Sequence, residues 1–411
     1  MRIAIVGSGV SGLVAAALLR REHDIAVFEG DARIGGHVNT LTVPAGEGGG
    51  EVEVDTGFIV YNEGNYPNFT RLLGTLGVAT QPTQMGFSVR CDRTGLEYNG
   101  SSLRQLFVQK RNLLDPSFHR MLLDIVRFNR AAPAAVRNGS ANLTLGEYLE
   151  EAAFTPRLAE HYLTPMGSAL WSVPRSTVLD MPAAFFVRFF EQHGMLQVDG
   201  RPSWRVVQGG SRRYVDALVA PFRDRIRLNT PVREVLRFPD HVRVDGEPFD
   251  HVVLACHSDQ ALKLLADPSP AEREILGALP YQANDVVLHT DASVLPRRRA
   301  AWAAWNYALA GTGDAPASVT YHMNELQSIV DPRTFCVTLN PTAAIDPARV
   351  LYQTRYDHPV YSLAGMRAQE RRAEISGAAR THYCGAYWGF GFHEDGVRSG
   401  LDVARGLGVD P

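Results

Sequence analysis

Near its amino terminus the chain carries the run Ile3-Ala4-Ile5-Val6-Gly7-Ser8-Gly9-Val10-Ser11-Gly12. Its four apolar residues are typical of a strand that is buried on both faces. The glycines that follow predict a tight turn into a helix over residues 13–20. In such a turn Gly7 allows the bend, Gly9 lets a pyrophosphate approach the backbone, and Gly12 lets the helix pack closely on the strand. Because a helix that begins beside a strand end offers N–H groups and partial positive charge, the run predicts a phosphate-binding turn.

A second apolar strand, residues 25–28, ends in the acidic residue Glu29. Glu29 comes about twenty residues after the glycines, where a carboxylate accepts hydrogen bonds from the adenosine ribose hydroxyls. The same carboxylate repels a 2′-phosphate, which argues against NADP. Together these features predict a Rossmann-like, dinucleotide-binding domain. No second Gly-x-Gly-x-x-Gly occurs, so no nicotinamide site is expected, and oxygen, a quinone or another carrier would reoxidise the cofactor.

Directly after Glu29 the chain reads Asp31-Ala32-Arg33-Ile34-Gly35-Gly36-His37. An Arg-x-Gly-Gly element at this spacing resembles the second fingerprint of the flavin-containing amine oxidase superfamily. That group includes monoamine and polyamine oxidases, protoporphyrinogen oxidase, phytoene desaturases and UDP-galactopyranose mutase. The resemblance implies that the glycines let the chain pass a flavin and that Arg33 meets a phosphate. His37 stands where many relatives have arginine, and both a position facing the flavin and a purely structural role remain open.

The resemblance implies further contacts with FAD, which we expect to be non-covalent. Asp55 and Gly57 belong to a turn that returns to the flavin, and the backbone of Val232 lies against the adenine. Near the C-terminus, Tyr383-Cys384-Gly385-Ala386 ends a strand, and Glu394-Asp395-Gly396-Val397 begins a helix. This resembles the closing FAD motif of the family, in which a helix N-terminus stabilises negative charge on the flavin.

The closing motif departs from the family at one position. Relatives usually carry an acidic residue where this chain has Ala386, and that residue holds the ribityl chain. Two explanations remain open: either Glu394 or Asp395 replaces the acidic residue, or the alignment is shifted by some residues.

The length of 411 residues predicts two domains. We expect an α/β fold with a Rossmann-like FAD-binding domain of the amine oxidase (GR2) type and an interleaved α+β substrate domain that carries a helical cap. The predicted FAD-binding domain is discontinuous and comprises residues 1–85, 200–265 and 374–411. Residues 86–199 and 266–373 form the predicted substrate domain, with the cap helices between 103 and 194. Its antiparallel strands are expected at 286–290, 318–322, 335–339 and 350–355, and residues 355–359 at a turn facing the substrate.

Composition excludes several other classes of protein. The net charge of -3 gives no indication of nucleic-acid binding. The four cysteines are scattered without a Cys-x-x-Cys pair, which argues against a metal site or a disulfide framework and for a reducing, cytoplasmic compartment. No run of eighteen apolar residues exists, so no membrane span is expected. For the basic and aromatic cap two interpretations remain open: its stripes face its own core, or they rest on the inner membrane surface as a peripheral contact.

The chemistry is inferred from the lysines and the C-terminal motif. Many amine oxidases of this superfamily hold a lysine that bonds through water to flavin N5, whereas this chain has only Lys110 and Lys263, neither at a suitable position. The lack of a suitably placed lysine argues against amine oxidation and for a substrate that is oxidised at carbon. The ending Gly-Ala-Tyr-Trp-Gly-Phe-Gly-Phe-His-Glu-Asp-Gly-Val resembles a bacterial subfamily of FAD/NAD-binding proteins associated with cyclopropane-fatty-acid-synthase-like lipid methyltransferases. The resemblance implies a modified membrane fatty acid as substrate and a lipid methyltransferase as partner.

We therefore predict an FAD-dependent desaturase or oxidase of a lipophilic carbon substrate. Tyr387, Trp388 and His393 are the expected catalytic-site residues near the flavin ring, with His393 either a proton acceptor or a histidine that fixes the loop. Three alternatives remain: a flavin-dependent double-bond isomerase or mutase, an amine or porphyrinogen oxidase, and a non-catalytic flavin-binding partner of a lipid methyltransferase.

Overall fold

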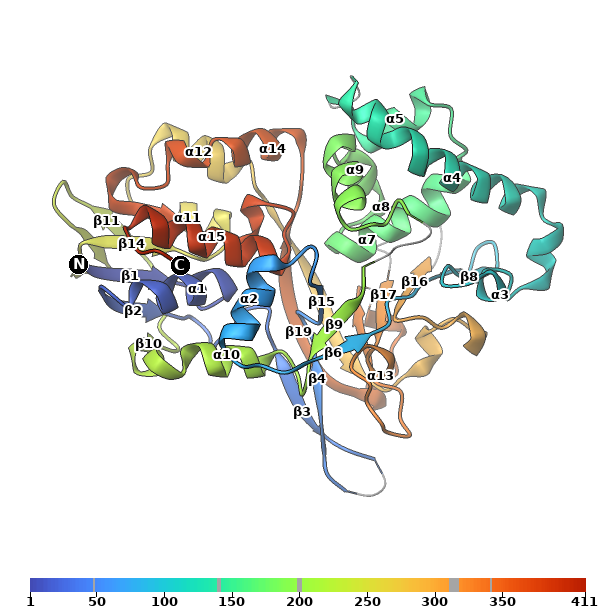
Figure 1. Cartoon of the computed structure of the whole chain (residues 1–411), viewed down its shortest axis with the longest axis horizontal. Helices are drawn as coiled ribbons and strands as arrows, with labels where there is room; N and C mark the ends of the chain where they lie inside the picture. Colours follow the sequence, from blue (N-terminus) through green and yellow to red (C-terminus); the bar gives the residue numbers. More distant parts are fainter. Residues whose placement is uncertain (47–48, 139–141, 198–201, 310–317, 341) are drawn as a thin grey trace.

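A five-stranded parallel sheet and the helices that cover it form one half of the molecule. Both chain termini lie in this half (Figure 1). The computed structural model describes residues 1–46, 49–138, 142–197, 202–309, 318–340 and 342–411. In spatial order the strands of this sheet are β10 (Ile226–Arg227), β2 (Asp24–Phe28), β1 (Arg2–Val6), β14 (His251–Leu254) and β20 (Thr381–Tyr383). The predicted α/β fold with a Rossmann-like sheet is confirmed.

Both faces of this sheet are buried, as the apolar run of β1 predicts. Ile3 and Ile5 pack on one face, and Ala4 and Val6 on the other, because successive side chains of a strand point to opposite sides. The helices on the Ile3 face are α1 (Val10–Leu19), α2 (Pro67–Thr75), α10 (Arg212–Val219) and α15 (His393–Gly406). The helices on the Ala4 face are α11 (Ser258–Leu264), α12 (Pro270–Gly277) and α14 (Leu363–Glu370). Helices α12 and α14 thus cover the parallel sheet, although they fall within the sequence range predicted for the substrate domain.

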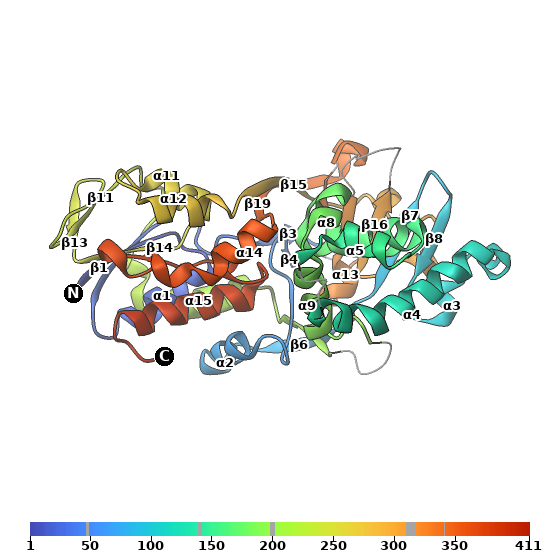
Figure 2. The ribbon, with the colours of Figure 1, turned by 90° about the horizontal axis from the view of Figure 1, so that it is seen from above.

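The second large sheet has seven strands and lies beside the helical cap (Figure 2). In spatial order its strands are β19 (Val350–Pro359), β15 (Tyr281–His289), β18 (Cys336–Leu339), β17 (Ser318–His322), β16 (Trp305–Leu309), β7 (Phe87–Cys91) and β8 (Leu96–Asn99). The sheet is mixed rather than antiparallel, because β16 pairs with β7 in parallel. Residues 355–359, predicted as a turn, are the last residues of β19.

The remaining strands form three small sheets. They consist of β3 (Thr40–Pro44) with β4 (Glu51–Asp55), of β5 (Val60–Asn62), β9 (Trp204–Val207) and β6 (Thr80–Thr83), and of β11 (Val235–Arg237), β12 (Val242–Val244) and β13 (Glu247–Phe249). From the sequence, residues 242–244 are expected to be a strand of the parallel sheet, and the last of these small sheets corrects that expectation. Their side chains pack against its Ala4 face instead.

The cap is helical and has its own core. Its helices are α3 (Leu103–Leu106), α4 (Pro116–Arg137), α5 (Leu145–Glu151), α6 (Pro156–Leu158), α7 (Thr164–Trp171), α8 (Arg175–Asp180) and α9 (Ala183–Gln192). The aromatic side chains of α9 pack in this core around Trp171, whose ring lies 4.9 Å from that of Phe189. For the aromatic stripe of α9, the interpretation that it faces its own core is confirmed.

Candidate functional site

A cavity of about 1360 Å³ lies where the two large sheets and the cap meet. Its lining begins at the carboxyl ends of β1 and β2, passes the last residues of β19, and ends among β7, β16, β17, α7 and α9. Pockets for single small ligands usually enclose about 300–1,000 Å³. The cavity therefore has room for a dinucleotide at one end and a substrate at the other.

The glycine turn forms the first wall of the cavity. Gly7 has a φ of +109°, and a Cβ there would lie 2.9 Å from the carbonyl oxygen of Ala255. At Gly12 a Cβ would lie 2.2 Å from the carbonyl oxygen of Gly7, so this glycine allows α1 to pack on β1. Around Gly9, by contrast, no atom lies within 4 Å of the Cβ position, and the residue lines the cavity. The open side of the turn, at the N-terminus of α1, thus suits a pyrophosphate.

Glu29 lies beside the turn with its carboxylate held in place. One oxygen accepts from the Ser8 amide at 3.0 Å and from the Ser8 hydroxyl, and the other accepts from the Asp31 amide at 2.9 Å. Arg33 and Val232 line the same end of the cavity. The Arg33 guanidinium is anchored at 3.1 Å to the carbonyl oxygen of Val38. This end presents the features that an adenosine diphosphate requires.

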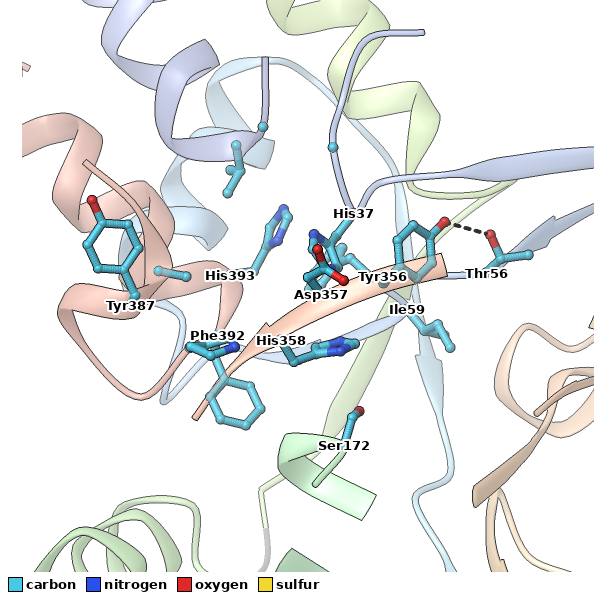
Figure 3. Close-up of a pocket in the computed structure, with 18 of the residues that line it drawn as sticks. His37, Thr56, Ile59, Ser172, Tyr356, Asp357, His358, Tyr387, Phe392 and His393 are labelled. Carbon is cyan, nitrogen blue, oxygen red and sulfur yellow. Dashed lines mark hydrogen bonds between the residues drawn. The ribbon is translucent and has the colours of Figure 1, made fainter. Parts of the chain in front are cut away.

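The paired glycines bring His37 to the middle of the cavity. Gly35 and Gly36 both have positive φ, of 119° and 58°. Gly57 lies directly against the turn, since a Cβ there would be 1.9 Å from the carbonyl oxygen of His37. Burial lowers the pKa of His37 well below its usual value, and within the described residues its buried Nε2 has no hydrogen-bond partner. His37 therefore faces the cavity as a neutral ring (Figure 3).

The C-terminal motif supplies the opposite wall. Its residues on the cavity are Gly385, Ala386, Tyr387, Gly391, Phe392 and His393. His393 is the first residue of α15 and stacks on Phe58 with 3.7 Å between ring centres. Its Nε2 lies 2.5 Å from the Tyr214 hydroxyl, and burial lowers its pKa to about 3. These contacts favour the interpretation that His393 fixes the loop.

Sequence comparison decides the family. The model of the flavin-containing amine oxidoreductases matches residues 10–313, more than half of the chain. The chain belongs to this family.

Individual relatives agree with this assignment. AofH of Mycobacterium tuberculosis, which is named as a flavin-containing monoamine oxidase, is 26% identical over 367 residues, covering 81% of this chain and 74% of that protein. Cyclohexylamine oxidase from Brevibacterium oxydans has the same fold, with a TM-score of 0.69 at 17% identity over 98% of both chains. The fatty acid isomerase of P. acnes that produces CLA also shares the fold, with a TM-score of 0.68 at 16% identity over 98% of both chains.

The flavin oxidoreductase is thus an FAD-dependent enzyme whose cavity fits its cofactor. The open side of Gly9, the anchored carboxylate of Glu29 and the partnerless Nε2 of His37 follow one another along the cavity. Within the described parts of the chain, no group of three or more histidine, cysteine, aspartate or glutamate residues is placed to hold a metal ion.

Several residues predicted to contact the cofactor or substrate lie outside the cavity. They are Asp55, Trp388, Asp395, Gly396 and Val397, and Gly12 also lies outside, as its predicted role in helix packing requires. Trp388 and Val397 belong to the two cores on the faces of the parallel sheet. Trp388 lies under the guanidinium of Arg372, 5.5 Å from its ring centre, and it does not line the cavity, so its role beside the flavin stays a prediction. Tyr387 and Trp388 both belong to the core on the Ala4 face, and Tyr387 lines the cavity as well.

The acidic residues after His393 stabilise the loop and the helices instead of holding a ribityl chain. Asp395 accepts from the amides of Phe390 at 2.9 Å and Phe392 at 3.1 Å. Gly396 allows α15 to pack on α1, since a Cβ there would lie 2.6 Å from the Val10 side chain. Neither Asp395 nor Glu394 lines the cavity, so the alternative that one of them replaces the missing acid at Ala386 is not supported.

Asp55 likewise joins parts of the fold. Its buried carboxylate accepts from the Thr40 hydroxyl at 2.5 Å, from the amide and hydroxyl of Ser211 at 2.9 and 2.7 Å, and from the Gln327 amide group at 3.1 Å. Burial raises its pKa to about 6. Asp55 thus connects the small β3–β4 sheet to the start of α10, and the predicted flavin contact is not supported.

Glu394 caps α2, which predicts a large effect on stability. Its carboxylate accepts from the amides of Asn68 at 3.1 Å and Phe69 at 2.9 Å, two N–H groups of the first turn. Replacing Glu394 with alanine leaves these groups without a partner and should lower the free energy of unfolding by about 2 kcal/mol. The exposed Asp402→Ala variant on the same helix should lose less than about 1 kcal/mol. Equal losses in urea titrations of the two variants would contradict the capping role.

Sequence reasoning missed part of the site. Tyr356, Asp357 and His358 of β19 line the cavity, and His257 completes this polar group. The sequence predicts residues 355–359 at a turn facing the substrate; they line the cavity, but as the last residues of β19, whose pairing with β15 the local pattern does not predict. The small residues and tryptophan at positions 167–172 predict a pocket wall; Leu170 of α7 and Ser172 at its C-cap line the cavity, whereas Trp171 donates from its indole to the Phe390 carbonyl at 3.1 Å.

Proposed function

We propose that this FAD-dependent oxidoreductase desaturates or oxidises a lipophilic carbon substrate such as a modified membrane fatty acyl chain. The observation that carries the proposal is the apolar character of the cavity beyond β19. Its lining there includes Met85, Phe87, Tyr98, Tyr162, Met166, Leu170, Phe189, Met195, Trp305 and Tyr321. Because each buried methylene contributes about 0.8 kcal/mol, a long chain would gain most of its affinity from such a surface.

Charged groups are scarce in this half of the cavity. Of the described lining residues, Glu29, Asp31, Arg33 and Lys263 belong to the dinucleotide end, and only Arg355 and Asp357 lie toward the substrate domain. These two pair with each other at 3.5 Å. Both side chains are partly exposed, 68% for Arg355 and 38% for Asp357, so this pair lies toward solvent and leaves the apolar part of the lining without a charge. The arrangement therefore favours a carbon substrate over an amine.

The two lysines support the same conclusion. Lys263 is 76% exposed in its side chain and pairs with Asp259 at 3.3 Å, and Lys110 is exposed on the cap. Lys110 does not line the cavity, and Lys263 lines it only at the dinucleotide end. When bound, FAD supplies the two-electron acceptor for a C–H hydrogen that leaves as hydride, while a neighbouring hydrogen leaves as a proton and dioxygen, a quinone or another carrier reoxidises the cofactor. The residues of this chain orient the substrate and exclude water.

The fatty-acid profile of cells with and without the protein tests the proposal. Mass spectrometry should show one acyl species that loses two mass units, and this change should disappear in a variant that cannot bind FAD. An unchanged mass at a new retention time would instead indicate a double-bond isomerase, a function for which the fatty acid isomerase of the same fold is the precedent. No change in any lipid, with or without a co-expressed lipid methyltransferase, would refute the acyl-chain proposal.

A peripheral membrane contact through the outer face of the cap belongs to this proposal. Leu103, Leu114 and Leu123 are 76%, 87% and 66% exposed. The exposed basic residues on the same elements include Arg104, Lys110, Arg120 and Arg130. Apolar and basic groups together suit an anionic lipid surface. In the described part of the chain no helix is both long and apolar enough to cross a bilayer.

Vesicle binding tests this contact. The double variant Leu114→Asp, Leu123→Asp should bind anionic phosphatidylglycerol vesicles at least about tenfold more weakly, because each inserted leucine contributes roughly 1.5–3 kcal/mol. Val330→Asp is the control, since Val330 is 99% exposed but lies outside the cap. Equal sedimentation of both variants with the vesicles would exclude this face as the contact.

A further inference from the structure

A chain of hydrogen bonds behind β19 fixes the ring of His358. The Asp285 amide donates to Asn340 Oδ1 at 2.9 Å, and Asn340 Nδ2 donates to Asn284 Oδ1 at 2.5 Å. Asn284 Nδ2 then contacts the Gln282 carbonyl at 3.2 Å and His358 Nδ1 at 2.9 Å. Asn284 is a fully buried residue of β15 and pairs with Tyr356 of the neighbouring β19.

The direction of every bond in this chain is determined by the backbone. A backbone N–H can only donate, so Asn340 must present its oxygen to Asp285 and its NH₂ to Asn284. Asn284 in turn must present its oxygen to Asn340, and its NH₂ faces both the Gln282 carbonyl and His358 Nδ1. Nδ1 of His358 is therefore an acceptor, and in a neutral ring the proton is on Nε2.

The imidazole ring of His358 is neutral, and its Nε2 faces the cavity. Burial lowers the pKa of His358 to about 4, with a further contribution from the neighbouring His257. His358 lines the cavity, and no described residue accepts a hydrogen bond from its Nε2. Figure 3 shows His358 beside His37 and Asp357, and the rings of His37 and His358 are 5.2 Å apart. A fixed N–H donor thus lies at the junction between the dinucleotide end and the apolar end.

We propose that His358 is a binding residue whose Nε2–H donates to an acceptor atom of a bound ligand, and that Asn284 and Asn340 are the positioning residues that hold it in this tautomer. The acceptor is a carbonyl oxygen or ring nitrogen, supplied either by the flavin or by a carbonyl group of the substrate next to the apolar chain. His358 cannot serve as a proton acceptor, because its only lone pair is engaged by Asn284. The inference rests on the function proposed above only in its choice of an acyl ester as probe.

Two variants of His358 separate the donor from the ring. His358→Gln retains an N–H donor at nearly the same distance from the backbone. His358→Leu retains a side chain of similar size but has no N–H donor. We measure the Kd of FAD by titration of the apoprotein and the Kd of methyl decanoate, an ester with a carbonyl group, on the holoprotein. A neutral hydrogen bond to a ligand is worth about three- to tenfold in affinity.

The two sources of the acceptor give different results. If the acceptor is on the flavin, FAD binds three- to tenfold more weakly to His358→Leu than to wild type, and His358→Gln binds FAD with wild-type affinity. If the acceptor is the substrate carbonyl, the same pattern occurs with methyl decanoate while FAD affinity is unchanged. Equal affinities in wild type and His358→Leu for both ligands, or a His358→Gln variant as weak as His358→Leu, would overturn the proposal.

The tautomer itself is measured by ¹⁵N NMR of the holoprotein, with the His358 signals assigned by their loss in His358→Gln. We expect a protonated Nε2 and an unprotonated Nδ1 at neutral pH. Asn284→Asp should change this state, because a carboxylate accepts a hydrogen bond from Nδ1–H. A wild-type ring protonated on Nδ1 would overturn the proposal. This readout needs no turnover, so failure of the lipid experiment with the expected tautomer would refute only the acyl-chain function.

Discussion

Replacing Gly9 with alanine should leave the fold intact and weaken FAD binding by about ten- to one-hundredfold. Apart from its chain neighbours, no described residue has an atom within 4 Å of the added Cβ, which would project into the cavity where the pyrophosphate approaches the turn. Excess atoms in a closely packed site cost roughly 1–3 kcal/mol, and each 1.4 kcal/mol corresponds to tenfold in affinity. Flavin titration gives the affinity, and thermal unfolding of the apoprotein shows whether the fold has changed.

Two other glycines provide matched controls for Gly9. Gly74 also has nothing within 4 Å of its Cβ position but lies in α2 outside the cavity, so Gly74→Ala should keep full FAD affinity. Gly12→Ala should destabilise the apoprotein, since its Cβ would lie 2.2 Å from the Gly7 carbonyl oxygen. If Gly9→Ala binds FAD as tightly as wild type, the phosphate-binding role of the turn is wrong.

Placing a carboxylate in the apolar half of the cavity should abolish turnover of an acyl substrate without loss of FAD. Leu170 on α7 lines the cavity, and a Leu170→Asp side chain there would face the apolar chain of the substrate. An uncompensated charge next to such a chain costs several kcal/mol, so we expect the rate of acyl conversion to fall by at least about one-hundredfold. The yield of the desaturated acyl species, measured by mass spectrometry, gives the rate.

The control for this variant conserves volume and apolarity. Leu170→Met should retain most of the activity, because such exchanges usually cost less than about 1.5 kcal/mol. FAD occupancy should be equal in both variants, since Leu170 belongs to the cap half of the cavity. An amine substrate would give the opposite result, because a carboxylate attracts an ammonium ion and Leu170→Asp would then be as active as wild type or more active.

The parts of the site that the sequence predicts correctly are those built from neighbouring residues. The glycine turn and the second strand follow one another within the first 29 residues, and each glycine lies in the environment that its spacing implies. Strand β17 was likewise expected at residues 318–322, where local alternation and flanking links define it.

Long-range packing decides what the sequence could not predict. Asp395 and Trp388 belong to a motif that resembles a cofactor site, yet their side chains face a loop and a core because of how α15 packs on the parallel sheet. The bond between Asn284 and His358 joins residues 74 positions apart on two paired strands. No local pattern relates them, and only the register of β15 with β19 places them together.

The most direct test of the account is the absorbance of the bound flavin without oxygen. Purified holoprotein is mixed anaerobically with vesicles of the membrane lipids that carry the candidate acyl chains, and in parallel with primary amines and polyamines. The account predicts that the oxidised-flavin absorbance is lost with the lipids and persists with the amines. Loss of the oxidised-flavin absorbance with the amines, and no loss with the lipids, would contradict the account and identify the protein as an amine oxidase.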